Sequence, residues 1–189
     1  MSPLQSPSQL SRQEFLKYPE IQPPREYING KIYQKPRLKG KQERVLNRLL
    51  EVINQTGKRQ KTAGAFTNLR CTFENYSIVP DIAVFSSNNF PINSEGKLVR
   101  DRDFIPNWII EFLSTEDHST RTINNILICL QRGTQLGWLI DVYEQKIITF
   151  PQGEQPDLKE KDDCLPILAG LRTLNLSVAD VFNLPTKQS

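Results

Sequence analysis

Residues 77–85, "SIVPDIAVF", place a carboxylate inside a run of apolar residues. Ile78, Val79 and residues 82–85 are typical of a buried strand, whereas Asp81 is not. A buried carboxylate costs several kcal/mol unless a cation or hydrogen-bond donors satisfy it. The rest of the chain therefore has to supply a partner for Asp81.

A second acid interrupts another apolar run, "NWIIEFLS" at residues 107–114, where Glu111 stands between Ile110 and Phe112. Asp81 and Glu111 are 111 − 81 = 30 residues apart, enough for a strand, a loop and a return to a neighbouring strand. Because adjacent strands lie about 4.8 Å apart, the two side chains are able to present oxygens to one point.

Two carboxylates brought together repel each other, and one takes up a proton unless a cation lies between them. Oxygen ligands without His or Cys suit Mg²⁺ or Mn²⁺, which activate water and stabilise charge on a phosphate. The alternative is a pair of buried acids satisfied by Arg or by backbone donors. The spacing leaves both interpretations open.

The positive charge of the chain is concentrated in one segment. Net charge is only +3, but seven basic residues stand between positions 31 and 48 against the single acid Glu43. The segment includes Lys35, Arg37, Lys39 and Lys41, which we predict to bind nucleic-acid phosphates. A solvated, charged helix face is the alternative.

Length and composition predict one domain of ordinary type. The 189 residues divide into a loosely ordered lead-in, residues 1–24, and a single domain, residues 25–185. No apolar run approaches the ~20 residues of a membrane span, and the N-terminus lacks a signal-peptide core, so we expect a cytoplasmic protein. The single histidine, His118, excludes multi-histidine zinc sites, and we expect Cys71, Cys129 and Cys164 to be packing residues.

Periodicity and turn signals predict the elements of an α/β fold. Residues 25–36 read as a hairpin around Asn29-Gly30, and residues 40–55 and 118–133 as amphipathic helices. Strands are predicted within residues 64–73, 77–85 and 107–114, a second hairpin within 135–150 and a short helix at 177–184. We expect Trp108 and Trp138 to be core residues. This order predicts a mixed β-sheet flanked by α-helices.

The motifs "EYINGKIYQKP", "KGKQERVLNRLLEVINQ", "VPD", "IIEFLS" and "NILICLQRGTQLGWLID", in this order, resemble the PD-(D/E)xK nuclease superfamily. More closely, the chain is similar over nearly its whole length to the Uma-two family of bacterial proteins classed as restriction endonucleases. The resemblance implies a restriction-endonuclease-like core and a Mg²⁺ ion held by Asp81, Glu111 and the backbone carbonyl of Phe112. It also implies a site residue near the start of the first core helix, where Gln42 and Glu43 stand.

The sequence departs from the family pattern at its cationic residue. Leu113 occupies the position two residues after Glu111 where the superfamily has lysine, and the family is thought to take a lysine from the next helix instead. The matching positions here are Arg121 and Asn125, four residues apart on one helix face. Arginine is always protonated, so it stabilises a phosphate's charge but is no base, and asparagine supplies only a neutral hydrogen bond. Gln42 stands where a histidine is usual.

Two hypotheses follow, because the acid pair of the family pattern is present and its cationic residue is altered. In the first, the chain is a Mg²⁺-dependent DNA endonuclease, with the metal on Asp81 and Glu111 and the scissile phosphate steadied by Arg121. In the second, it is a catalytically weakened nuclease-like module that binds DNA or a protein partner. By analogy with other proteins of this fold, we also expect a homodimer.

Overall fold

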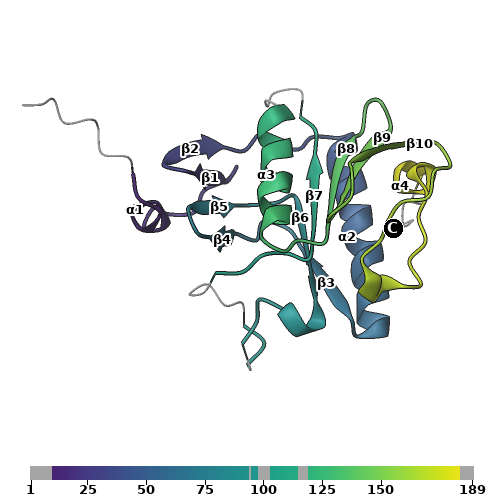
Figure 1. The fold of residues 1–189 in the computed structure, drawn as a ribbon, viewed down its shortest axis with the longest axis horizontal. Helices are drawn as coiled ribbons and strands as arrows, with labels where there is room; N and C mark the ends of the chain where they lie inside the picture. The colour runs from purple at the N-terminus through teal and green to yellow at the C-terminus, as the bar shows by residue number, and fades with distance from the viewer. Residues whose placement is uncertain (1–9, 94, 98–102, 115–118, 184–189) are drawn as a thin grey trace, which may run out of the picture.

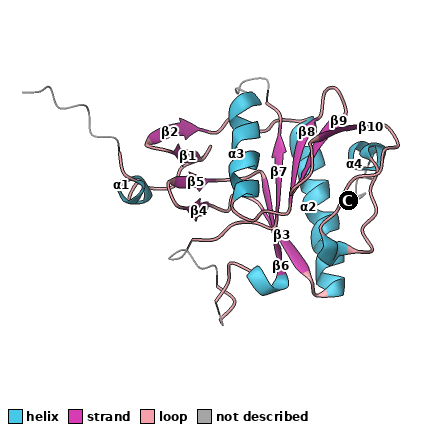
Figure 2. Ribbon diagram, in the orientation of Figure 1, coloured by secondary structure: helices cyan, strands magenta, loops and turns pink. Residues whose placement is uncertain are grey.

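A six-stranded mixed sheet forms the centre of the computed structural model, which describes residues 10–93, 95–97, 103–114 and 119–183 (Figures 1 and 2). Its strand order is β10-β9-β8-β7-β6-β3, and only β7 and β8 run parallel. The strands of this large sheet are β3 (Ala63–Phe66), β6 (Ile82–Ser86), β7 (Trp108–Phe112), β8 (Leu136–Asp141), β9 (Lys146–Pro151) and β10 (Asp157–Glu160).

Two helices cover opposite faces of the large sheet, because its strands are apolar on both sides. Helix α2 (Lys41–Gln60) packs Leu49 and Ile53 into the core that contains Ile82 and Ile110. Helix α3 (Ser119–Gln131) packs into a second core, which contains the alternate strand residues Ala83, Phe85 and Ile109. The predicted mixed sheet with flanking helices is therefore confirmed.

A second, antiparallel sheet of four strands was not predicted. It runs in the order β2-β1-β5-β4, and its apolar residues close the core on the α3 side. Its strands are β1 (Arg25–Ile28), β2 (Lys31–Gln34), β4 (Cys71–Phe73) and β5 (Tyr76–Ile78).

The second sheet exists because two runs that we predicted to be strand-like divide between the sheets. Residues 77–85 break at Pro80, which has no N–H to donate to a ladder, so β5 ends at Ile78 and β6 begins at Ile82. Residues 64–73 also divide, between β3 of the large sheet and β4 of the small one. Asp81 thus lies at a crossing between the sheets, and our placement of it inside a strand is wrong.

The other predicted elements are present. Asn29 and Gly30 both have positive φ in the tight turn between β1 and β2, and a second hairpin joins β8 to β9. Helix α4 (Val178–Asn183) lies within residues 177–184 as predicted, although residue 184 is outside the described part. Trp108 and Trp138 are fully buried and meet edge to face, with ring centroids 4.7 Å apart.

One expectation about the cysteines is wrong, and the lead-in contains a short helix. Cys71 and Cys129 are buried as expected, but Cys164 is exposed, because it lies beside the irregular C-terminal segment rather than in the core. Within the described part of the lead-in, helix α1 (Arg12–Leu16) packs Phe15 against Tyr27 of β1.

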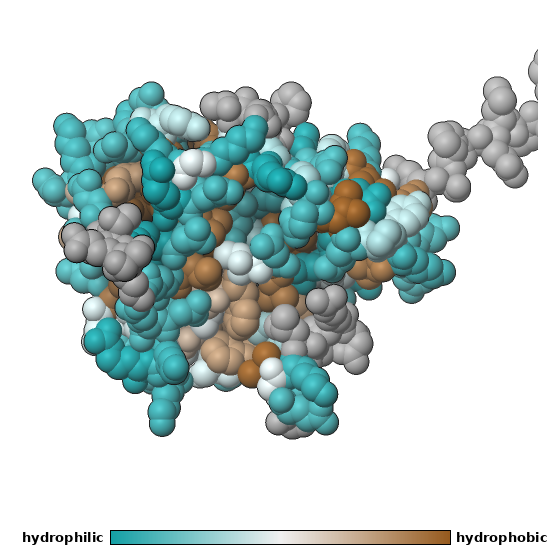
Figure 3. Space-filling model, turned by 180° about the vertical axis from the view of Figure 1, so that it is seen from behind, coloured by the Kyte–Doolittle hydropathy of each residue, from teal (hydrophilic) through white to brown (hydrophobic). Residues whose placement is uncertain are grey.

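The surface seen from behind is mainly hydrophilic, with a smaller hydrophobic area low on that face (Figure 3). None of the helices in the described residues is long and apolar enough to span a membrane.

Gly57 of α2 provides a test of how closely this helix approaches the sheet. A Cβ at position 57 would lie 2.1 Å from the carbonyl oxygen of Ala63 in β3. Glycine-to-alanine changes usually stabilise a helix interior. Here we expect Gly57→Ala to lower the free energy of unfolding by ~1–3 kcal/mol, because backbone must shift to admit the methyl group. Urea denaturation measures the change, with Lys58→Ala as the control on the exposed side of the same turn. A stabilised Gly57→Ala protein would contradict the close approach.

Candidate functional site

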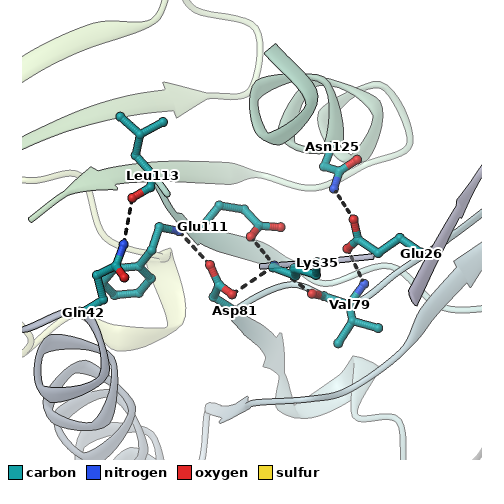
Figure 4. Close-up of polar contacts among 9 residues, drawn as sticks. Glu26, Lys35, Gln42, Val79, Asp81, Glu111, Leu113 and Asn125 are labelled. Atoms are coloured by element: carbon teal, nitrogen blue, oxygen red, sulfur yellow. Dashed lines mark hydrogen bonds and ion pairs between the residues drawn. The ribbon is translucent and has the colours of Figure 1, made fainter. Parts of the chain in front are cut away.

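Asp81 and Glu111 lie opposite each other on the same face of the large sheet. In the β6–β7 register, Ile82 pairs with Ile110, which brings Asp81, one residue earlier, across from Glu111. The backbone N–H of Phe112 donates to Asp81 Oδ2 at 2.8 Å, so Asp81 is tied to the strand that carries Glu111. The two predicted site carboxylates therefore lie together, although they are 30 residues apart in the chain (Figure 4).

Glu111 is among the most buried charged residues, with 1% of its side chain exposed. Its Oε2 lies 2.6 Å from Lys35 Nζ, while its Oε1 has no hydrogen-bond partner among the described residues. Burial raises the pKa of Glu111 well above its ordinary value, and the charges of Asp81 and Glu26 add to this effect while Lys35 opposes it.

Lys35 lies between the two acids, immediately after β2 of the small sheet (Figure 4). Its ammonium is 3.0 Å from Asp81 Oδ1, 2.6 Å from Glu111 Oε2 and 2.9 Å from the carbonyl oxygen of Val79. Burial by itself would lower the pKa of Lys35, but the charges of Asp81, Glu111 and Glu26 outweigh it and the pKa is raised. The ammonium form is thus the resident cation between the carboxylates.

This position of Lys35 differs from the one we expected. We grouped it with Arg37, Lys39 and Lys41 as a phosphate-binding residue of the surface, and those three side chains are indeed exposed. Only 12% of the Lys35 side chain is exposed, and its charge faces the acids.

Glu26 is a third buried acid beside this cluster, and sequence reasoning missed it. Its Oε1 accepts a hydrogen bond from the Val79 N–H at 2.9 Å, and its Oε2 accepts one from Asn125 Nδ2 at 3.1 Å. Glu26 is 3% exposed. Buried and exposed residues do not alternate along β1, so the only sequence signal for the burial of Glu26 was its place inside a short strand. It holds the segment that leads into Asp81.

The other predicted site residues make different contacts, and the cation that pairs with the two acids is Lys35. Gln42 is buried at the start of α2, where Nε2 donates to the carbonyl oxygen of Leu113 at 2.8 Å. Glu43 is exposed on the next position. Asn125 reaches the cluster through Glu26, and the Arg121 guanidinium lies over the Tyr33 ring, 4.3 Å from its centroid.

A groove of about 440 Å³ gives access to the cluster from outside. Lys35 and Asp81 form part of its wall, together with Arg37, Glu43 and Pro80. A polymer laid along this groove would pass beside Lys35 and Asp81. The exposed Arg37 stands at the same opening, where it is able to contact a phosphate.

The donor set fits a hard divalent ion. Two carboxylates converge on one point, and Glu111 Oε1 is a buried oxygen that still lacks a partner. In the described residues no group of three or more His, Cys, Asp or Glu side chains is arranged to hold a metal. An ion here would have only two side-chain ligands, an arrangement that Mg²⁺ accepts because it retains waters and binds substrate phosphates.

Comparisons with known proteins agree on one family. A family model described as "Putative restriction endonuclease", Uma2, matches residues 12–179. A solved structure titled as a "putative nuclease belonging to DUF820" from Anabaena variabilis is 40% identical, with a TM-score of 0.86. The match covers 92% of this chain and 97% of that one. A search of curated proteins found no match.

The contacts of Glu26 predict that its role is to hold the backbone before Asp81. Glu26→Ala leaves the Val79 N–H and the Asn125 amide without their acceptor, whereas Glu26→Gln keeps an acceptor oxygen of the same reach. We expect the alanine variant to be less stable than the glutamine variant by ~1–3 kcal/mol in thermal or urea unfolding. Hydrogen exchange at the Val79 amide should also be faster in the alanine variant than in the glutamine variant. Equal stability of the two variants would show that Glu26 acts through its charge alone.

Proposed function

Since the chain belongs to the Uma2 family of restriction-endonuclease-like proteins, we propose that it is a divalent-metal-dependent endonuclease that hydrolyses phosphodiester bonds of DNA. The observation that carries the proposal is the convergence of Asp81 and Glu111 on one cation position at the wall of an open groove. The description of the Anabaena relative as a nuclease supports the same activity.

In this proposal Asp81 and Glu111 are the ligands of Mg²⁺ or Mn²⁺, with the Phe112 carbonyl as a further oxygen. Such an ion supplies activation of water and neutralisation of phosphate charge. The Phe112 N–H keeps Asp81 Oδ2 in place, which leaves Oδ1 facing the cation position. Glu26 and Asn125 are positioning residues, because they hold the Val79 backbone next to Asp81.

The DNA backbone is proposed to follow the groove, with Arg37, Lys39 and Lys41 as its phosphate contacts. All three are exposed and precede or begin α2, beside the groove that Lys35 and Asp81 line. Contacts of this kind position a duplex without reading its sequence, and they weaken as salt concentration rises.

One observation favours a second function, a nuclease-like module that binds DNA without cutting it. The ammonium of Lys35 already pairs with both acids, so the carboxylates have a cationic partner without any metal. Retained DNA binding without cleavage is the outcome that would identify this module.

Cleavage of supercoiled plasmid tests the proposal directly. We expect nicking by the wild-type protein with Mg²⁺ or Mn²⁺, none with EDTA, and a loss of roughly 10²–10³-fold or more in Asp81→Asn and Glu111→Gln. Both substitutions preserve side-chain size, and circular dichroism checks that the variants fold. Lys31→Gln, on exposed β2 surface, is the matched control. Nicking that persists in both acid variants comes from a contaminant and refutes the proposed site.

Metal affinity should depend on pH in a direction fixed by Glu111. Its pKa is raised, so at low pH the carboxyl is protonated and neutral, and an ion must displace that proton to bind. Affinity for Mn²⁺ is therefore expected to rise with pH, by up to about tenfold per unit for one displaced proton, until Glu111 is ionised. Calorimetry in buffers of different ionisation enthalpy measures affinity and released protons together. An affinity that falls as pH rises would contradict this role of Glu111.

A further inference from the structure

The Lys35 ammonium contacts three oxygens of the site. It donates hydrogen bonds to Glu111 Oε2 and to the Val79 carbonyl oxygen, and it forms an ion pair with Asp81 Oδ1 at 3.0 Å. Two of these acceptors are the carboxylates that a divalent ion needs. Because both cations require the same oxygens, the ammonium and the ion compete for one position.

The backbone brings Lys35 to this place from the other sheet. Its own N–H donates to the Pro24 carbonyl oxygen at 2.8 Å, and Pro36 restricts its backbone to extended conformations. The strand of Glu111 supplies no cation, because β7 (Trp108–Phe112) has no basic residue and Leu113 follows it. The cation beside the two acids is instead Lys35, which comes from the small sheet.

We propose that Lys35 is the cationic catalytic residue of this site and that it exchanges places with the divalent ion. In the metal-free chain its ammonium is the counter-ion of Asp81 and Glu111. When the ion takes the carboxylates, the flexible lysine stem turns the ammonium into the adjoining groove, where the scissile phosphate lies. The inference rests on the proposed nuclease function.

The groove makes this exchange possible, because Lys35 and Asp81 already form part of its wall. The ammonium does not have to cross the core to reach a phosphate, and Arg37 stands at the same opening. Arg121 is less suited to the task, since its guanidinium lies over the Tyr33 ring, 4.3 Å from the ring centroid.

The role of Lys35 in hydrolysis is to stabilise charge. Its ammonium donates hydrogen bonds to a non-bridging phosphate oxygen while water oxygen bonds to phosphorus and the bond from phosphorus to the leaving oxygen breaks. The proton lost by the water goes to solvent, and the leaving oxygen takes one from solvent. Lys35 neither gives up nor accepts a proton in this step, because both proton transfers involve solvent.

The test compares Lys35→Gln and Lys35→Arg with wild type, and uses Lys31→Gln as the control on the same strand. Mn²⁺ binding is measured without DNA, by calorimetry and by the rise in melting temperature. We expect Lys35→Gln to bind Mn²⁺ at least about tenfold more tightly, because its competitor is gone, a gain of ~1.4 kcal/mol. Its cleavage rate should fall by roughly 10²–10³-fold. Lys35→Arg should keep part of the rate, since a guanidinium also stabilises phosphate charge.

Unchanged Mn²⁺ affinity or an unchanged cleavage rate in Lys35→Gln would overturn the inference while leaving the nuclease function standing. Failure of the proposed function looks different, because wild-type protein would then cut no DNA with either metal. If Lys35→Gln does not fold, the lysine ammonium signals of wild type, observed by nuclear magnetic resonance and assigned with Lys35→Arg, decide the exchange. A Lys35 signal that moves on addition of Mg²⁺ supports it, and one that stays in place refutes it.

Discussion

The structure depends on the charge balance of one buried cluster. Asp81, Glu111 and Glu26 are three acids removed from water, and a single ammonium, that of Lys35, lies among them. Removal of one partner from such a cluster is costly, because it leaves an uncompensated buried charge. Ion pairs and hydrogen bonds, rather than apolar contacts, hold these side chains together. The buried Glu111 Oε1 without a partner is consistent with the divalent ion that we propose for this site.

The two sheets divide the work of building this cluster. The large sheet supplies Glu111 and, through the β6–β7 register, the place of Asp81. The small sheet supplies Glu26 and directs Lys35 inward from the end of β2. The break at Pro80 joins the two, because the same short segment offers its N–H to Glu26 and its carbonyl to Lys35 at Val79. The site is therefore a property of the junction between sheets, and neither sheet carries it alone.

Features that depend on local sequence pattern were predicted from the sequence, whereas those that depend on contacts with the second sheet were missed. Apolar runs interrupted by Asp81 and Glu111 were sufficient to pair these acids, since Asp81 directly precedes β6 and the β6–β7 register brings it across from Glu111. The helices and the Asn29-Gly30 hairpin followed from periodicity and turn chemistry. Lys35 looked like one more residue of a basic surface, because its burial depends on contacts with Asp81 and Glu111, 46 and 76 positions away. Glu26 escaped for the same reason, and Pro80 was read as part of a strand although it ends one.

The crossing at residues 79–81 has a further consequence for how the chain folds. Pairing of β6 with β7 is sufficient to bring Asp81 and Glu111 together, whereas Lys35 reaches them only from the four-stranded sheet. Facing carboxylates repel each other when no cation lies between them. The small sheet therefore relieves a repulsion at the β6–β7 end of the large sheet, and the two sheets depend on each other through charge as well as through their shared apolar core.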